Sequence, residues 1–169
     1  EMCGRDWSSD VCSSDLEYYL ATVVNAYRCA IDDYLANKAG WSPEKYQVEL
    51  DKAMSRKYSE LFYDREDNKD IQNYDDDGRS TVPYEYGAKV LEKKDGLSIV
   101  EVRNKLQVGS QYEMIIPGKI EPEIITIGEL YNIDTNEKID VVNPGKAEQK
   151  VLMKLPDSAE NNYIIRRRK

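Results

Sequence analysis

The spacing of the apolar residues changes from a helical to a strand-like period part-way along the chain. Before about residue 54 the apolar side chains recur every three or four residues, as they do along one face of a helix. After Val82 they alternate with polar residues, in the order Tyr84, Tyr86, Ala88 and Val90. Alternation with a period of two is typical of a strand that buries one of its faces. The chain is therefore expected to join a helical segment to a sheet.

The second half of the chain contains a series of strand-like runs with no helical pattern between them. The six runs span residues 84–90, 97–102, 111–116, 124–130, 138–142 and 149–155. Turn-forming pairs such as Asp95-Gly96 and Pro117-Gly118 separate them. Short consecutive strands favour an antiparallel sheet, and a sheet this small needs its edges closed. The expected fold class is α+β, with an N-terminal helical segment followed by a small antiparallel β-barrel of about six strands over residues 82–165.

Two helices are expected before the sheet. The apolar residues from Leu20 to Leu35 follow the pattern i, i+3, i+4, i+7, and Gly40 supplies a stop. Ser42 and Pro43 then supply an N-cap and a first-turn proline. We expect helices over about residues 18–39 and 43–54.

An acidic segment, residues 55–81, separates the helices from the sheet. It has few aliphatic side chains, so we expect a solvated linker. The run Asp75-Asp76-Asp77-Gly78 lacks the alternating ligands and the final glutamate of an EF-hand loop. A solvated charge run therefore explains it better than a calcium site.

Residues 1–16 do not look like native sequence. Asp6 to Leu16 reads Asp-Trp-Ser-Ser-Asp-Val-Cys-Ser-Ser-Asp-Leu, which matches one reading frame of a common sequencing adapter. We treat residues 1–16 as adapter-like and leave them out of the fold prediction. The alternative is a disordered polar N-terminus with a genuine cysteine pair, Cys3 and Cys12.

The composition excludes several kinds of active site. The 169 residues include no histidine, which rules out Ser-His-Asp and Cys-His catalysis and histidine metal ligands within this chain. Beyond residue 16 Cys29 is the one cysteine, so neither a disulfide framework nor a cysteine cluster is expected, and a reducing cytoplasmic location is the default. No apolar run is long enough to span a membrane. We expect no catalytic, cofactor or metal site in this chain, and no activity from the chain alone.

The net charge of −8 belongs to the first part of the chain. Residues 17–78 contain 14 acidic and 8 basic residues, whereas residues 79–169 contain 14 acidic and 15 basic ones. Basic side chains at turns are candidates for contacts to nucleic-acid phosphate. These candidates are Lys93, Lys94, Arg103, Lys105 and the residues Arg166, Arg167 and Arg168 of an expected basic tail, 166–169. A solvated hairpin tip and a disordered tail are the alternatives.

Three stretches together resemble the collagenase-like peptidase family U32. They are the helical segment Tyr19–Asp32, the linker residues Ser55-Arg56-Lys57-Tyr58 with Phe62 and Gln72-Asn73-Tyr74, and the turn Glu101-Val102-Arg103-Asn104-Lys105-Leu106-Gln107-Val108-Gly109. Leu61 stands where the family usually has a glycine, a departure that concerns the local turn.

The resemblance implies that this chain is the C-terminal part of a longer protein. Residues 17–54 would be the terminal helices of a catalytic domain, and the barrel would be similar to those of translation factors. The parent would hydroxylate tRNA uridine with prephenate as the oxygen source, using an iron–sulfur cluster held by cysteines of that catalytic domain. The barrel would then help to position tRNA or substrate. The alternative is a collagenase-like peptidase in which the barrel is a lid or a protein-binding module. The implied partners are the catalytic domain and tRNA.

Individual residues allow two interpretations. Cys29 is either a cluster ligand or, more economically, a small packing residue. Arg28 either holds an anionic substrate beside the catalytic domain or pairs with Asp32 one helical turn away. Tyr84 and Tyr86 either stack on bases or pack in the interior.

Overall fold

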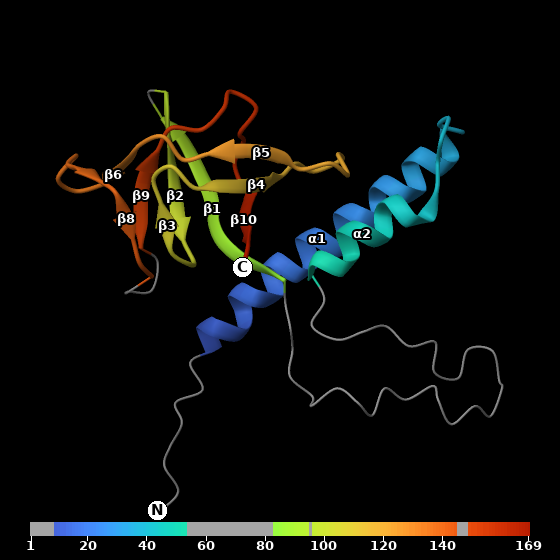
Figure 1. The fold of residues 1–169 in the computed structure, drawn as a ribbon, viewed down its shortest axis with the longest axis horizontal. Coiled ribbons are helices and arrows are strands. Elements are labelled where there is room, and N and C mark those ends of the chain that lie inside the picture. The colour runs from blue at the N-terminus through green and yellow to red at the C-terminus, as the bar shows by residue number, and fades with distance from the viewer. Residues whose placement is uncertain (1–8, 54–82, 95, 145–148) are drawn as a thin grey trace, which may run out of the picture.

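A computed structural model describes residues 9–53, 83–94, 96–144 and 149–169 (Figure 1). A pair of antiparallel helices lies to one side of a curled antiparallel sheet, so the α+β fold class is confirmed. The expected linker over residues 55–81, like residues 1–8, lies outside the described residues. Among the helices that the structure describes, none is long and apolar enough to cross a membrane.

The two helices form a hairpin. Helix α1 spans Ser9–Leu35 and α2 spans Pro43–Ala53, so α2 begins at the predicted proline. Asn37 and Gly40 adopt positive φ angles of 49° and 76° in the connection, a conformation typical of helix C-termini. Helix α1 begins about nine residues before the predicted start, within the adapter-like stretch. Extending an existing helix adds one hydrogen bond per residue and is therefore easy.

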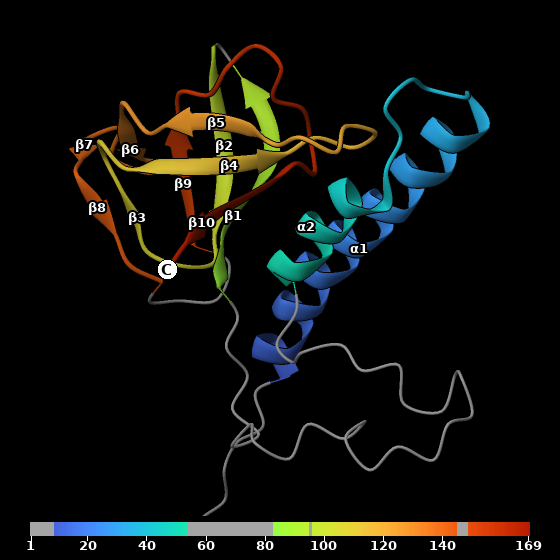
Figure 2. The ribbon, with the colours of Figure 1, turned by 45° about the vertical axis from the view of Figure 1, so that its right-hand side comes forward.

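In the described part of the chain, ten strands follow the helices. They are β1 Tyr84–Lys94, β2 Leu97–Val102, β3 Leu106–Gln107, β4 Gln111–Ile115, β5 Glu123–Thr126, β6 Leu130–Asn132, β7 Lys138–Ile139, β8 Val141–Val142, β9 Lys150–Met153 and β10 Ile164–Arg168. Eight of them form one antiparallel sheet in the order β5-β4-β10-β1-β2-β9-β6-β7, and β3 pairs with β8. Figure 2 shows the curl of this sheet.

Residues 106–110 connect the two outer strands of the sheet. The Gly109 amide donates to the Ile127 carbonyl just after β5 (2.7 Å), and the Val108 amide donates to the Asp140 carbonyl between β7 and β8 (2.9 Å). Gly109 has φ 82°, which glycine adopts without strain. The sheet therefore curls into a barrel-like shape whose two edges are bridged by this segment.

The barrel interior is filled by alternating side chains. The fully buried members of this core include Val90, Val100, Leu106, Met114, Leu130, Met153 and Ile165. A smaller cluster lies between the barrel and α1, with Tyr18, Tyr86, Ile115 and Ile164 at its centre. Tyr86 is 3 % exposed and stacks on Tyr18 with ring centroids 6.0 Å apart, so it packs in the interior rather than presenting a base-stacking face.

The strand count exceeds the predicted six for identifiable reasons. The predicted strand 124–130 is divided into β5 and β6, and the predicted strand 138–142 is divided into β7 and β8. Leu106–Gln107 forms the additional short strand β3. The expected basic tail is wrong, because Ile164–Arg168 forms β10 between β1 and β4. The run of three arginines was interpreted as a tail, but these residues alternate as in a strand. Ile165 points into the barrel, and Ile164 and Arg166 point toward the helices.

Candidate functional site

The helices attach to the barrel through a buried group of charged side chains, here named the interface ion cluster: Arg166 of β10, Glu113 of β4, and Glu49 and Lys52 of α2. Arg166 has no exposed surface, and its guanidinium Nη2 lies 2.5 Å from a Glu49 carboxylate oxygen and 2.7 Å from Glu113. Lys52 Nζ lies 2.5 Å from Glu49 and 3.2 Å from Glu113. Two cations thus neutralise two carboxylates where water is excluded, as a buried charge requires.

Glu113 responds to these neighbours. Burial alone would raise the pKa of Glu113, but Arg166 and Lys52 outweigh burial and hold it below its usual value of 4.5. A carboxyl group whose folded-state pKa is depressed stabilises the fold fully above its unfolded-state pKa and loses that contribution as the pH falls through the folded-state value.

We therefore expect the free energy of unfolding to decline as the pH is lowered below about 4.5, the unfolded-state value of Glu113. Urea denaturation at pH 7 and at steps below pH 4.5 measures this decline. The substitution Glu113→Gln removes the titrating group, so it should lower stability at pH 7 and flatten the acid decline. An acid decline as steep in Glu113→Gln as in the wild type would contradict the assignment.

A second polar group anchors the N-terminal part of α1. The Glu17 carboxylate accepts hydrogen bonds from Lys89 and from the Tyr86 hydroxyl, and lies 3.9 Å from Arg103. Arg103 also pairs with Glu101 at 3.2 Å. The guanidinium of Arg103 is thus committed to intramolecular contacts.

Asn25 anchors the middle of α1 to the turn between β4 and β5. Its side-chain oxygen accepts the Gly118 amide at 2.8 Å, and its side-chain nitrogen donates to the Lys119 carbonyl at 2.9 Å. Gly118 has φ 79°, as the turn requires. Together, Glu17 and Asn25 hold α1 against the barrel at two separate points along its length.

The candidate phosphate contacts lie at opposite ends of the barrel. Lys93 and Lys94 lie at the β1–β2 hairpin, where Lys93 pairs with Asp157 at 3.1 Å. Arg103 follows β2 at the other end, about 17 Å away for a six-residue strand. The amides of Arg103 and Asn104 both donate to the Gly87 carbonyl near the start of β1.

Arg168 lies at the same end of the barrel as Arg103, because it pairs with Tyr84 at the first position of β1. Its side chain is exposed, as are those of Lys105 and Lys169. These three residues are here named the basic end. The structure thus places Lys105 and Arg168 at the same end of the barrel, opposite Lys93 and Lys94.

Arg166 and Arg167, two of the predicted phosphate contacts, form ion pairs within the protein instead. Arg166 is enclosed by the interface ion cluster, so the prediction of a surface contact at Arg166 is wrong. Arg167 pairs with Glu85 on β1 and lies over the Tyr112 ring. Both arginines stabilise the fold because β10 sits inside the sheet rather than trailing from it.

The candidate residues on α1 fit their structural interpretations. Arg28 is exposed and pairs with Asp32 at 2.9 Å. Cys29 is 5 % exposed, and burial together with Asp33 and Asp32 raises the pKa of its thiol. A protonated lone thiol does not suit an iron–sulfur cluster, and the described residues contain no group of three or more metal-ligating side chains.

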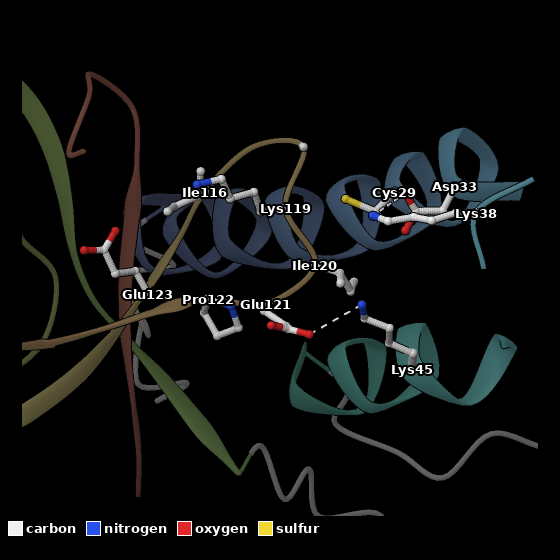
Figure 3. A pocket seen from close by; sticks show the side chains of 11 residues that line it. Cys29, Asp33, Lys38, Lys45, Ile116, Lys119, Ile120, Glu121, Pro122 and Glu123 are labelled. Carbon is white, nitrogen blue, oxygen red and sulfur yellow. Dashed lines mark hydrogen bonds and ion pairs between the residues drawn. The ribbon is translucent and has the colours of Figure 1, made fainter. Parts of the chain in front are cut away.

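Figure 3 shows a pocket of about 410 Å³ between the helical hairpin and the β4–β5 turn. Two ion pairs line it, Lys45 with Glu121 at 3.4 Å and Lys38 with Asp33 at 3.1 Å, and Lys119 and Glu123 are its other charged residues. Burial and the hydrogen bond to Asp33 raise the pKa of Tyr46 to about 12. The Tyr46 hydroxyl, which donates to Asp33, therefore stays protonated at neutral pH.

Sequence reasoning missed the partners of Arg166. Glu49 lies on a helix that reads as an ordinary amphipathic one, and Glu113 sits in an alternating strand where a polar residue is expected on the outer face. Neither residue stands out in the sequence, because their role depends on the helices covering the outer face of β4 and β10. The one signal available was the position of three arginines directly after Ile164 and Ile165.

Two family models match the chain. The model of peptidase family U32 matches residues 14–73, and that of the peptidase family U32 C-terminal domain matches residues 83–166. The first match contains most of α1 and all of α2, and the second contains the barrel up to Arg166.

Curated relatives are similar across the helices and the barrel. The tRNA hydroxylation protein P of Escherichia coli (strain K12) is 30% identical over 150 residues, which are 88% of this chain and 31% of that protein. The tRNA hydroxylation protein P1 of Bacillus subtilis (strain 168) is 29% identical over 123 residues, 71% of this chain and 29% of that protein. The chain therefore spans less than a third of the length of either relative.

Among solved structures, one similar chain is the C-terminal domain of a Geobacillus thermoleovorans protein described as a U32 peptidase. The two chains are 21% identical with a TM-score of 0.43, and the match covers 49% of this chain and 99% of that one.

Proposed function

Because this chain belongs to peptidase family U32, we propose that its barrel helps to position tRNA for hydroxylation of a uridine by a longer protein. The observation that carries the proposal is the similarity to two tRNA hydroxylation proteins, which in the E. coli relative extends over 88% of this chain. The reacting groups, including the iron–sulfur cluster implied by the family resemblance, would lie in the rest of that protein. Its place of action would be the cytoplasm, where tRNA is found.

The basic end is the surface that we assign to the RNA. Lys105, Arg168 and Lys169 are exposed there, and Lys105 follows directly on the Arg103-Asn104 backbone that is fixed to Gly87. Asn104 donates from its side chain to the Tyr86 carbonyl at 2.8 Å, which further fixes the turn. Lysine and arginine side chains on a rigid turn and a strand end suit phosphate contacts, which orient a nucleic acid without reading its sequence.

The whole 169-residue chain is expected to bind tRNA in a salt-dependent manner through few contacts. The double variant Lys105→Gln, Arg168→Gln should weaken binding about tenfold at low salt and reduce the slope of log K against log salt by about 1.4 to 1.8, as expected for two lost phosphate contacts. Fluorescence anisotropy of labelled tRNA across a salt series measures both quantities.

The matched control is Lys93→Gln, Lys94→Gln, which removes the same charge at the opposite end of the barrel. This control should retain most of the wild-type affinity. Equal weakening by the two double variants would indicate a contribution of net charge alone, and would contradict the assignment to the basic end. No binding of the wild-type chain at low salt would contradict the proposed function and favour a lid or a protein-binding module of a peptidase.

A further inference from the structure

Helix α1 is apolar on two opposite sides. One side carries Tyr18, Ala26 and Cys29, which are at most 5 % exposed against the barrel and α2. The other side carries large apolar side chains that are all about half exposed or more. They are Leu20 (48%), Val24 (61%), Tyr27 (59%), Ile31 (50%), Tyr34 (62%) and Leu35 (71%), here named the outer stripe.

The outer stripe is continuous along the helix. With 3.6 residues per turn, its six side chains fall within about a third of the helix circumference, and the centre of that sector lies roughly opposite Tyr18 and Cys29. No charged residue of α1 between Leu16 and Ile31 falls inside the sector, since Glu17 and Arg28 lie at its edge or beyond it. A neutral stripe that runs the length of a helix is a contact surface rather than a solvated face.

The size of the stripe also exceeds what a solvated surface usually carries. Taking about 100 Å² for each half-exposed large side chain gives roughly 600 Å², about three quarters of the 800 Å² that one partner buries in a standard interface. Single exposed apolar residues are common, but an apolar patch of this extent marks an interaction site. A helix that is apolar all round is normally buried on every side.

The described chain leaves this side of α1 open. The barrel and α2 both pack against the inner side of α1, and α1 extends past the barrel in both views (Figures 1 and 2). In the described part of the chain the outer-stripe side chains are at least 48% exposed. Beside Val24, a groove of about 300 Å³ with mostly apolar walls separates α1 from Ile115, Pro117 and Ile164 of the barrel side. The groove extends the open apolar surface toward the barrel.

We infer that the outer stripe is the surface on which the remainder of the U32 domain packs, as part of the same polypeptide. The family U32 match covers residues 14–73 and is separate from the C-terminal domain match, so α2 and most of α1 belong to the U32 domain. Both relatives are more than three times as long as their matched regions. Two helices cannot form a core alone, because a domain needs a second layer on each apolar face.

In this arrangement α1 would contact two domains at once. Its outer side would join the large domain, while Glu17, Tyr18 and Asn25 on other sides hold the barrel. One rigid helix shared by two domains fixes their relative orientation. This inference rests on the family membership and not on the tRNA proposal, so loss of RNA binding would leave it standing.

The test joins residues 17–169 to the upstream part of the E. coli tRNA hydroxylation protein P, in place of that protein's own matched region. Hydroxyl-radical footprinting then compares Tyr27 and Tyr34 in this chimera and in the 169-residue chain. We expect their modification to fall at least threefold in the chimera, while Ile124 on the barrel, 61% exposed, and Val48 on α2, 59% exposed, remain unchanged.

A pair of variants provides a second readout. Val24→Gln, Ile31→Gln should lower the Tm of the chimera by several degrees and leave the Tm of the 169-residue chain unchanged, whereas Val48→Gln should alter neither. Equal modification of Tyr27 and Tyr34 in both proteins would overturn the inference. So would a dimer of the 169-residue chain, detected by light scattering, in which both tyrosines are already protected, because a second copy would then be the partner.

Discussion

Replacing Arg166 with alanine is expected to lower the free energy of unfolding by about 3–5 kcal/mol. Arg166 has no exposed surface and contacts both Glu49 and Glu113, so its removal leaves two largely buried carboxylates with Lys52 alone. Breaking a buried ion pair costs far more than its net contribution, because the remaining charge has lost its hydration without compensation. Urea denaturation at neutral pH, followed by circular dichroism, measures the change.

A nearby position on the same strand supplies the matched control. Arg168→Ala removes an exposed arginine from β10, and its effect should stay within about 0.5 kcal/mol. The variant Arg166→Met retains the volume of the side chain but not its charge, so it should be nearly as destabilising as alanine. If Arg166→Met were as stable as the wild type, the carboxylates would not depend on Arg166 and the explanation would be wrong.

Local patterns predicted the elements whose formation depends on near neighbours. The proline at position 43 marked the start of α2, and the alternation at Tyr84, Tyr86, Ala88 and Val90 marked β1. These signals depend on backbone preferences and on the spacing of apolar residues along each helix or strand, and both can be read from a single sequence.

Burial that depends on distant partners was not predictable in the same way. Arg166 finds Glu113 at a separation of 53 residues and Glu49 at a separation of 117. An arginine run after two isoleucines resembles a solvated tail until the helices cover that face of the sheet. The same helices cover Tyr86, which packs on Tyr18, so of the two interpretations that the sequence allowed, interior packing applies to Tyr86.

The sequence also does not show which basic residues lie at the same end of the barrel. Lys93, Lys94, Arg103 and Lys105 are close in sequence, yet strand β2 separates the first pair from the second. Arg168 joins the second pair only because β10 pairs with β1. The antiparallel topology therefore decides which basic residues can contact one RNA, and a linear charge pattern does not contain that information.

The closure of the barrel provides the other large expected effect. Leu106→Ala is expected to lower the free energy of unfolding by about 2–5 kcal/mol, the range for truncating a fully buried leucine. Leu106 is 0% exposed and lies in β3 opposite Val142 of β8. Its Cδ2 atom also lies close to Gly87, because a Cβ atom added to Gly87 would be 3.5 Å from this Cδ2. The cavity would open where residues 106–110 bridge the two outer strands. Chemical denaturation at pH 7 measures the loss.

Val141→Ala is the control for Leu106→Ala, since Val141 is 42% exposed and lies in β8 opposite Gln107. It removes apolar atoms from the same pair of strands without opening an interior cavity, so we expect a loss below about 1 kcal/mol. A substantial loss from Val141→Ala together with a small one from Leu106→Ala would mean that strand pairing, and not interior packing, holds the bridge. Because β3 and β8 contribute only two residues each to their ladder, interior packing of Leu106 is the stronger restraint on this closure.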